Sequence, residues 1–141
     1  MARLTDLARP IVLAAAVAAA GCATAPDAGA NMTVVTVEAG YRERILLPPG
    51  HVLTVRIEDV SLADAPATVL AEIIEPLDGR APPYTVTLDV PTSQIDPRHT
   101  YAARASIHDA GGRLVFVTAE RHAVLTRDAP ADARITMQGV R

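Results

Sequence analysis

The stretch that decides the fold is LLPPGHVLTVRIEDVSLADAPA, residues 46–67. It opens with a turn, because proline presets φ and glycine tolerates positive φ. In the segment LTVRIE, residues 53–58, apolar side chains then alternate with polar ones. This period of two, with β-branched residues on the apolar face, predicts a strand buried on one side. The stretch closes in an acidic loop of small residues that ends at Pro66.

The rest of the chain repeats this unit of turn and alternating strand. The further predicted strands are residues 33–38, 41–47, 68–75, 84–90, 101–108, 114–118 and 135–137, and residues 123–125 are a short apolar piece. Residues 114–118 are apolar on both faces, which predicts a central strand. Seven or eight short strands, with turn residues between them and no convincing helix, predict an all-β fold. We expect a single antiparallel β-sandwich over residues 33–141.

Two local choices within this pattern depend on weak signals. Ala39-Gly40 is expected to form the turn that separates the first two strands. Residues 68–75 also fit a short helix capped by Asp64. Their β-branched side chains, their short length and Pro76 favour a strand instead.

The N-terminal segment has the composition of a secretory signal peptide. Arg3 and Arg9 precede an apolar run, residues 11–20, which is followed by a junction of small residues. That run is too short to span a bilayer, which takes about 20 apolar residues. We therefore expect a signal peptide at residues 1–21, and the alternative is a frayed N-terminal helix. Residues 22–32 are predicted to be a lipidated N-terminus and flexible tether.

Cys22 is the only cysteine, so no intramolecular disulfide can form. The small residues before it resemble a bacterial lipobox, with Ala19 where leucine is usual. That resemblance implies cleavage before Cys22 and attachment of diacylglycerol and an acyl chain there, which together anchor a protein stably. Ala23 in place of aspartate favours the outer membrane, with the domain facing the periplasm. We expect no other cofactor.

Charge and composition argue against a nucleic-acid partner. The net charge is −3, there is no basic run, and Phe116 is the only phenylalanine in a chain without tryptophan. A protein that binds nucleic acid needs a basic surface and commonly stacks bases on aromatic side chains. We expect a monomer. The three tyrosines, Tyr41, Tyr84 and Tyr101, are predicted at strand starts, where they would cap the ends of the core.

No catalytic or metal-binding pattern emerges from the histidines. They lie in predicted turns or on polar strand faces: His51, His99, His108 and His122. None has a metal-ligand spacing such as H-x-x-H. Ser106, His108 and Asp109 are neighbours in sequence, but nothing there provides an activated serine or an oxyanion hole. We therefore predict no catalytic residues.

The densest acidic cluster is Glu58, Asp59, Ser61 and Asp64. Calcium prefers six or more oxygen ligands, yet this segment lacks the glycine of a tight calcium loop. Side chains of these types also form Asx and Ser/Thr turns without any metal, and we prefer that interpretation.

The order of these features resembles the YbaY-like lipoproteins, which are grouped with the YscW lipoprotein chaperones of type III secretion. The resemblance covers roughly residues 34–140 and rests on residues 41–50, 53–61, 63–67, 82–86, 95–97, 101–107 and 112–114. It implies a β-sandwich lipoprotein of the cell envelope. The secretion branch includes pilotins, which escort secretin subunits to the outer membrane. Residues 58–67 are the most specific part, which makes Glu58, Asp59, Ser61 and Asp64 candidates for a partner surface.

Two functional hypotheses follow. The first is a non-enzymatic lipoprotein, anchored through Cys22, whose β-sandwich is a binding or assembly module for an envelope protein such as a secretin subunit. The alternative is a protein that binds or cleaves cell-wall glycans. Glycosidases need two carboxylates across a cleft, and the Glu58, Asp59 and Asp64 cluster is the candidate source.

Overall fold

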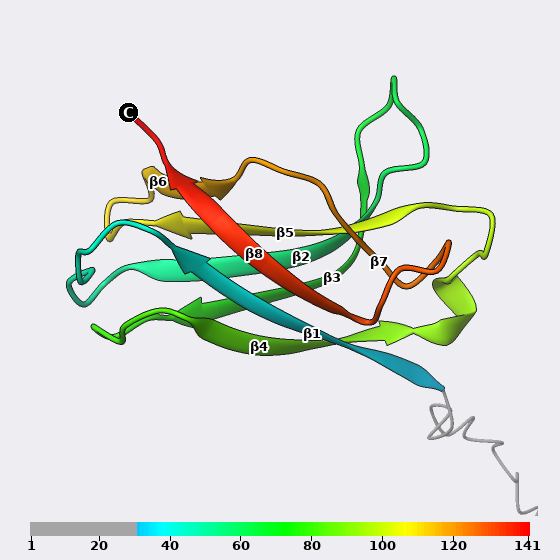
Figure 1. Ribbon diagram of the computed structural model, residues 1–141, viewed down its shortest axis with the longest axis horizontal. Coiled ribbons are helices and arrows are strands. Elements are labelled where there is room, and N and C mark those ends of the chain that lie inside the picture. The colour runs from blue at the N-terminus through cyan, green and yellow to red at the C-terminus, as the bar shows by residue number, and fades with distance from the viewer. Residues whose placement is uncertain (1–30) are drawn as a thin grey trace, which may run out of the picture.

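The computed structural model describes residues 31–141, which form eight β-strands and one short 3-10 helix (Figure 1). The strands are β1 (Met32–Tyr41), β2 (Val52–Asp59), β3 (Thr68–Pro76), β4 (Tyr84–Pro91), β5 (Tyr101–His108), β6 (Leu114–Thr118), β7 (His122–Val124) and β8 (Asp132–Gly139). The helix η1 spans Thr92–Gln94. Within residues 31–141, no helix has the length and apolar character needed to cross a membrane. The predicted signal peptide, Cys22 and residues 22–30 of the tether lie outside the described residues.

Hydrogen bonding runs through one sheet in the order β3-β2-β5-β6-β8-β1-β4, and β7 pairs alongside β5. The sheet curls around its core into a nearly closed, barrel-like shape, so that the terminal strands β3 and β4 come into contact. The all-β prediction with seven or eight strands is confirmed. The expectation of a purely antiparallel arrangement is wrong at one place, because β1 and β8 pair in parallel. Parallel neighbours need a long connection, and here nearly the whole domain lies between the two strands.

The buried face of β2 is the one that the sequence predicts. Leu53, Val55 and Ile57 are at most 1% exposed, while Arg56 of the same strand is exposed. Residues 53–58 pair with β3 on one side and β5 on the other, so β2 lies inside the sheet. The core is built mainly from β-branched and other aliphatic side chains of β1, β2, β4, β5 and β8. Area removed from water by such side chains is the main stabilising contribution to a domain of this size.

The predicted strand over residues 41–47 is wrong. Strand β1 continues through Ala39 and Gly40 to Tyr41, and residues 42–51 contain no strand. Ala39 pairs with β4 and β8 at once, and Gly40 pairs with Thr136 of β8, so both ladders keep the chain extended where a turn was expected. Of the apolar residues that follow, Leu47 packs into the core from a loop and is 4% exposed, whereas Ile45 is 54% and Leu46 62% exposed.

Other local predictions are confirmed. Residues 68–76 form strand β3, antiparallel to β2, and not a helix. Strand β6 lies between β5 and β8, as its two apolar faces predict. Between β5 and β6, the Asp109 carboxylate accepts hydrogen bonds from the backbone N–H groups of Gly111 and Arg113. Gly112 has a φ of +81°, a conformation that glycine adopts without strain.

The tyrosines do lie at the ends of the core, although Tyr41 ends a strand and does not start one. Its ring stacks on Phe116 with a centroid separation of 4.5 Å and lies 6.4 Å from the ring of Tyr84. Tyr101 is 1% exposed, and its hydroxyl accepts a hydrogen bond from the Asp96 N–H and donates one to the carbonyl of Gln94. The hydroxyls of Tyr41 and Tyr84 donate to the carbonyls of Ile45 and Arg80, so each buried phenol has a hydrogen-bond partner, as buried tyrosines usually do.

Candidate binding site at the loop between β2 and β3

The acidic cluster predicted from sequence lies where β2 leaves the sheet. Glu58 and Asp59 are its last two residues, and a register shift between Ile57 and Glu58 marks a bulge in the pairing with β3. Ser61 and Asp64 belong to the segment that follows, residues 60–67, which we call the projecting loop. Figure 1 shows this loop between β2 and β3, standing out from the rest of the domain.

Asp59 is the anchor at the base of the projecting loop. One of its carboxylate oxygens accepts hydrogen bonds from both the N–H and the hydroxyl of Ser61. The other accepts a hydrogen bond from Nδ1 of His99, at 2.6 Å. The Ser61 hydroxyl oxygen in turn accepts a hydrogen bond from the Thr100 N–H at 2.9 Å. These contacts link the projecting loop to residues 99 and 100, which precede β5. The base of the loop is therefore fixed by hydrogen bonds within the loop and by hydrogen bonds to that segment.

The same contacts set the acidity of Asp59. Desolvation, the largest single effect, would raise the pKa of this carboxyl. The hydrogen bonds from Ser61 and His99 favour the charged form and together outweigh desolvation, so the pKa of Asp59 lies below its ordinary value. Asp59 is therefore a carboxylate at neutral pH, and His99 must carry a proton on Nδ1 in order to donate.

Although this trio contains Ser, His and Asp, it is not arranged for nucleophilic catalysis. In a catalytic triad the serine hydroxyl is hydrogen-bonded to the ring nitrogen of histidine that faces away from the aspartate. Here the Ser61 hydroxyl donates to the Asp59 carboxylate itself. The arrangement is an Asx turn with an additional hydrogen bond from a histidine, and it stabilises the base of the projecting loop.

Glu58 has a different partner from Asp59. Its side chain is 12% exposed and forms an ion pair with Arg104 of β5, with 3.2 Å between Arg104 Nε and Glu58 Oε2. Arg104 is opposite Arg56 in the β2–β5 ladder, and Arg56 pairs with Glu72 of β3. On the outer face of β3, β2 and β5, two arginines therefore lie opposite each other, and each is neutralised by a glutamate.

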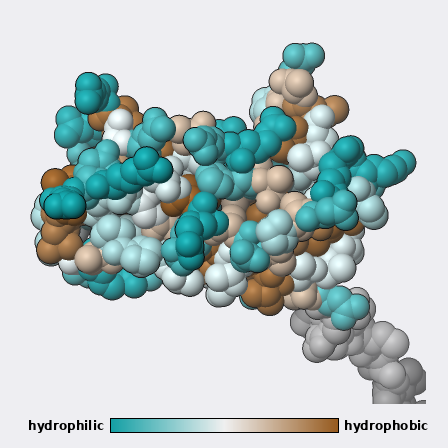
Figure 2. Space-filling model, in the orientation of Figure 1, coloured by the Kyte–Doolittle hydropathy of each residue, from teal (hydrophilic) through white to brown (hydrophobic). Residues whose placement is uncertain are grey.

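Asp64 is separate from both carboxylates. It is exposed in a turn of the projecting loop and forms no hydrogen bond or ion pair with any residue from 31 to 141. Its neighbours on the loop are apolar, and Leu62 is 73% exposed. Figure 2 shows the projection at the upper right, coloured mostly as hydrophobic to neutral with a hydrophilic residue at its tip. The structure thus does not bring Glu58, Asp59 and Asp64 together as the glycan-cleaving hypothesis requires.

A hollow of about 300 Å³ lies beneath the projecting loop. Its lining residues come from the loop, from the end of β2, and from positions 104 and 121: Glu58, Val60, Leu62, Ala63, Ala65, Ala67, Arg104 and Arg121. Two further hollows on the outer face of β2, β5 and β6 also include Arg104 in their walls. Arg104 therefore lines all three hollows.

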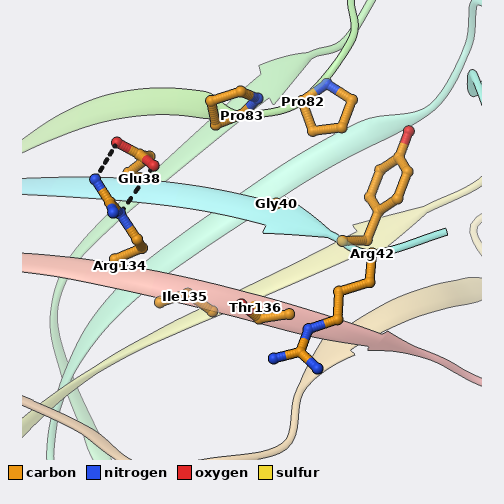
Figure 3. A pocket seen from close by; sticks show the side chains of 9 residues that line it. Glu38, Gly40, Arg42, Pro82, Pro83, Arg134, Ile135 and Thr136 are labelled. Carbon is orange, nitrogen blue, oxygen red and sulfur yellow. Dashed lines mark hydrogen bonds and ion pairs between the residues drawn. The ribbon is translucent and has the colours of Figure 1, made fainter. Parts of the chain in front are cut away.

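A second depression of about 300 Å³ lies over β1 and β8 (Figure 3). Gly40 forms its floor, and Pro82 and Pro83 stand on one side. Arg134 pairs with Glu38 across the ladder, with 3.0 Å between Nε and Oε1. Arg42 also lines this depression and forms no ion pair with any of residues 31–141, so the depression combines two proline rings with one free guanidinium group.

Residues 31–141 contain no group of three or more His, Cys, Asp or Glu side chains that could hold a metal ion. The histidines are dispersed over loops and strands. Ser106 and His108 lie on the outer face of β5, where they line the depression next to Arg104. His122 lies in β7, and its Nε2 is buried without a hydrogen-bond partner in the described part of the chain.

Sequence reasoning missed three residues of this site: His99, Arg104 and Arg121. His99 bonds to Asp59 across 40 positions of sequence, and no local pattern connects the two. Arg104 was visible as a polar position of an alternating strand, but only the β2–β5 register places it beside Glu58. Arg121 follows β6 in an irregular segment that has no periodicity to interpret.

Three comparisons show which known proteins this chain is similar to. Residues 30–137 match the family described as "Type III secretion system lipoprotein chaperone (YscW)". The chain is 32% identical, over 124 residues, to "Uncharacterized lipoprotein YbaY" of Escherichia coli (strain K12). That match covers 75% of this chain and 65% of the relative, so it spans about two thirds of the relative's length.

A solved structure is also similar: "Structure of an alternative pilotin from the type II secretion system of Vibrio cholerae". It superposes with a TM-score of 0.75 at 36% identity and covers 79% of this chain and 99% of that chain. The curled β-fold of residues 31–141 is therefore similar to the fold of that pilotin. Together with the match over residues 30–137, this shows that the chain belongs to the YscW family of lipoprotein chaperones.

Proposed function

We propose that this protein is a pilotin-like lipoprotein, in which the β-domain binds an envelope protein such as a secretin subunit and assists its assembly. The observation that carries the proposal is the similarity to the Vibrio cholerae pilotin, which covers 99% of that chain at a TM-score of 0.75. The role requires no catalysis, since binding and escort suffice.

The anchor is the second part of the proposal. Cys22 carries diacylglycerol and an acyl chain, and the domain faces the periplasm from the outer membrane. Two or three acyl chains give stable attachment, whereas one alone binds only marginally. We further propose that the domain is a monomer and that its curled sheet has two layers, β3-β2-β5-β6 facing β8-β1-β4 across the core.

Co-purification tests the binding role. A tagged, full-length protein extracted from membranes of its own host is expected to retain a secretin subunit through the C-terminal segment of that subunit. Deleting this segment from the secretin should abolish retention. If the intact secretin does not co-purify under conditions that preserve membrane complexes, the pilotin-like role is wrong.

Intact mass tests the anchor independently. The membrane-extracted protein should have the mass of residues 22–141 plus diacylglycerol and an acyl chain, and the Cys22→Ser variant should lack that added mass. A full-length or merely cleaved mass for the wild type would show that the lipobox resemblance is misleading.

A further inference from the structure

We infer that the hollow beneath the projecting loop is the docking site for a partner segment that carries apolar and acidic side chains. This inference rests on the proposed function, and it specifies which surface and which partner chemistry that function uses. The occupant we assign is a segment of the envelope partner, most directly the C-terminal part of a secretin subunit.

The apolar side of the hollow comes from the loop itself. Leu62 is 73% exposed, and the alanines on the same loop are small enough to leave space beside it. Leu62 and these alanines are neighbours on the loop, and a partner that covers them removes their apolar area from water. Because Asp59, Ser61 and His99 fix the base of the loop, this wall is held in place before binding. Such preorganisation lowers the entropy cost of association.

The charged side of the hollow is basic. Arg121 is exposed and forms no ion pair or hydrogen bond with any of residues 31–141. Arg104 lies in the same wall and pairs with Glu58 through one nitrogen, which leaves other donors of its guanidinium available. Among the residues that line the hollow, these two guanidinium groups outnumber the one carboxylate, that of Glu58. A carboxylate side chain is the complement to such a pair of guanidinium groups.

Glu58 favours a peptide over a lipid headgroup. Its carboxylate is nearly buried and lies in the same hollow as the two arginines. A peptide can donate a backbone N–H to Glu58 while its own carboxylate faces Arg121. A phosphodiester can pair with the arginines but has no hydrogen to donate to Glu58. The juxtaposition of an apolar wall, two guanidinium groups and one acceptor therefore matches an acidic, apolar peptide.

The first test uses the full-length lipoprotein and the secretin of its host in the co-purification assay. We expect Arg121→Glu to reduce retained secretin about tenfold, as reversing one interfacial charge commonly does. Arg44→Glu is the matched control, because Arg44 is exposed, lines none of these depressions and has no ion pair within residues 31–141. It should retain secretin like the wild type. Changing one acidic residue of the secretin segment to arginine should restore binding to the Arg121→Glu protein.

The second test is site-specific crosslinking in cells. A photoreactive amino acid at Leu62 should crosslink to the secretin, and the same group at Val34, which is 51% exposed on β1, should not. If secretin is retained but crosslinks only from Val34, or if both charge variants retain it equally, the docking site is wrong while the pilotin-like role stands. If Arg121→Glu loses only binding to vesicles of anionic phospholipid, the hollow is a lipid site and the inference is overturned. If the wild type retains no secretin, both fail.

Discussion

Truncating Asp59 should loosen the projecting loop and measurably destabilise the domain. The Asp59→Ala variant loses three hydrogen bonds, two from Ser61 and one from His99. A hydrogen bond contributes about 0.5–1.5 kcal/mol net, and one to a charged group somewhat more. Because the Asp59 side chain is 20% exposed and that of His99 46%, we take values near the lower end. The free energy of unfolding should fall by about 2 kcal/mol.

Asp64→Ala is the matched control for that prediction, since it removes the same atoms from the same acidic segment. Asp64 has no partner among residues 31–141, so its loss should change the unfolding free energy by less than about 0.5 kcal/mol. Thermal unfolding of both variants, followed by circular dichroism, measures the difference. For a domain of this size about 2 kcal/mol corresponds to a drop of about 8 °C in Tm.

The pH dependence of the difference gives a sharper check. The pKa of Asp59 is lower in the folded protein than in the unfolded chain, where it is about 3.9. Its contribution is therefore fully present above the unfolded pKa and is lost as the pH falls through the folded pKa. The gap between wild type and Asp59→Ala should be constant near neutral pH and should shrink below about pH 4. Equal stability of the Asp59 and Asp64 variants, or a gap that does not narrow in acid, would refute the anchoring role.

Three further predictions concern the rest of the domain. Ile107→Ala should cost about 3 kcal/mol in urea unfolding because this side chain is 0% exposed, whereas Val34→Ala on the surface should cost less than about 0.5 kcal/mol. Burial, reinforced by the neighbouring phenol, raises the pKa of Tyr84, so ultraviolet titration should show this phenol ionising above the ordinary value of about 10. The stability that Tyr84 contributes should then be present below pH 10 and lost in stronger alkali. Gly112→Ala should cost about 1 kcal/mol by thermal unfolding because its φ is +81°.

The strands that sequence predicts well are those whose pattern is local. Residues 53–58 alternate cleanly, and β2 buries the predicted face. Residues 84–90 and 101–107 behave in the same way in β4 and β5. In these segments the alternation of apolar and polar side chains identifies the buried face of the strand, because successive side chains of a strand point to opposite faces. The same reasoning resolved residues 68–75 as a strand, since β-branched side chains and a following proline disfavour a helix.

The errors and omissions concern non-local pairing. Ala39-Gly40 has the composition of a turn, yet hydrogen bonds to β4 and β8 hold it extended. The parallel pairing of β1 with β8 joins residues such as Glu38 and Arg134, which are 96 positions apart. Non-local pairing also explains what sequence reasoning missed at the site. The acidic cluster was identified from the sequence, but its partners were not: His99, which bonds to Asp59, precedes β5, and Arg104, which pairs with Glu58, lies in β5. A single sequence carries no signal for such register-dependent contacts.

The most direct test of the pilotin-like role is the amount of assembled secretin in the outer membrane of the host. Deleting the gene for this protein should deplete secretin multimers from that membrane. Complementation with the wild type should restore them, whereas complementation with Cys22→Ser, which lacks the proposed anchor, should not. If every secretin of the deletion strain remains multimeric and correctly located, the central claim is contradicted.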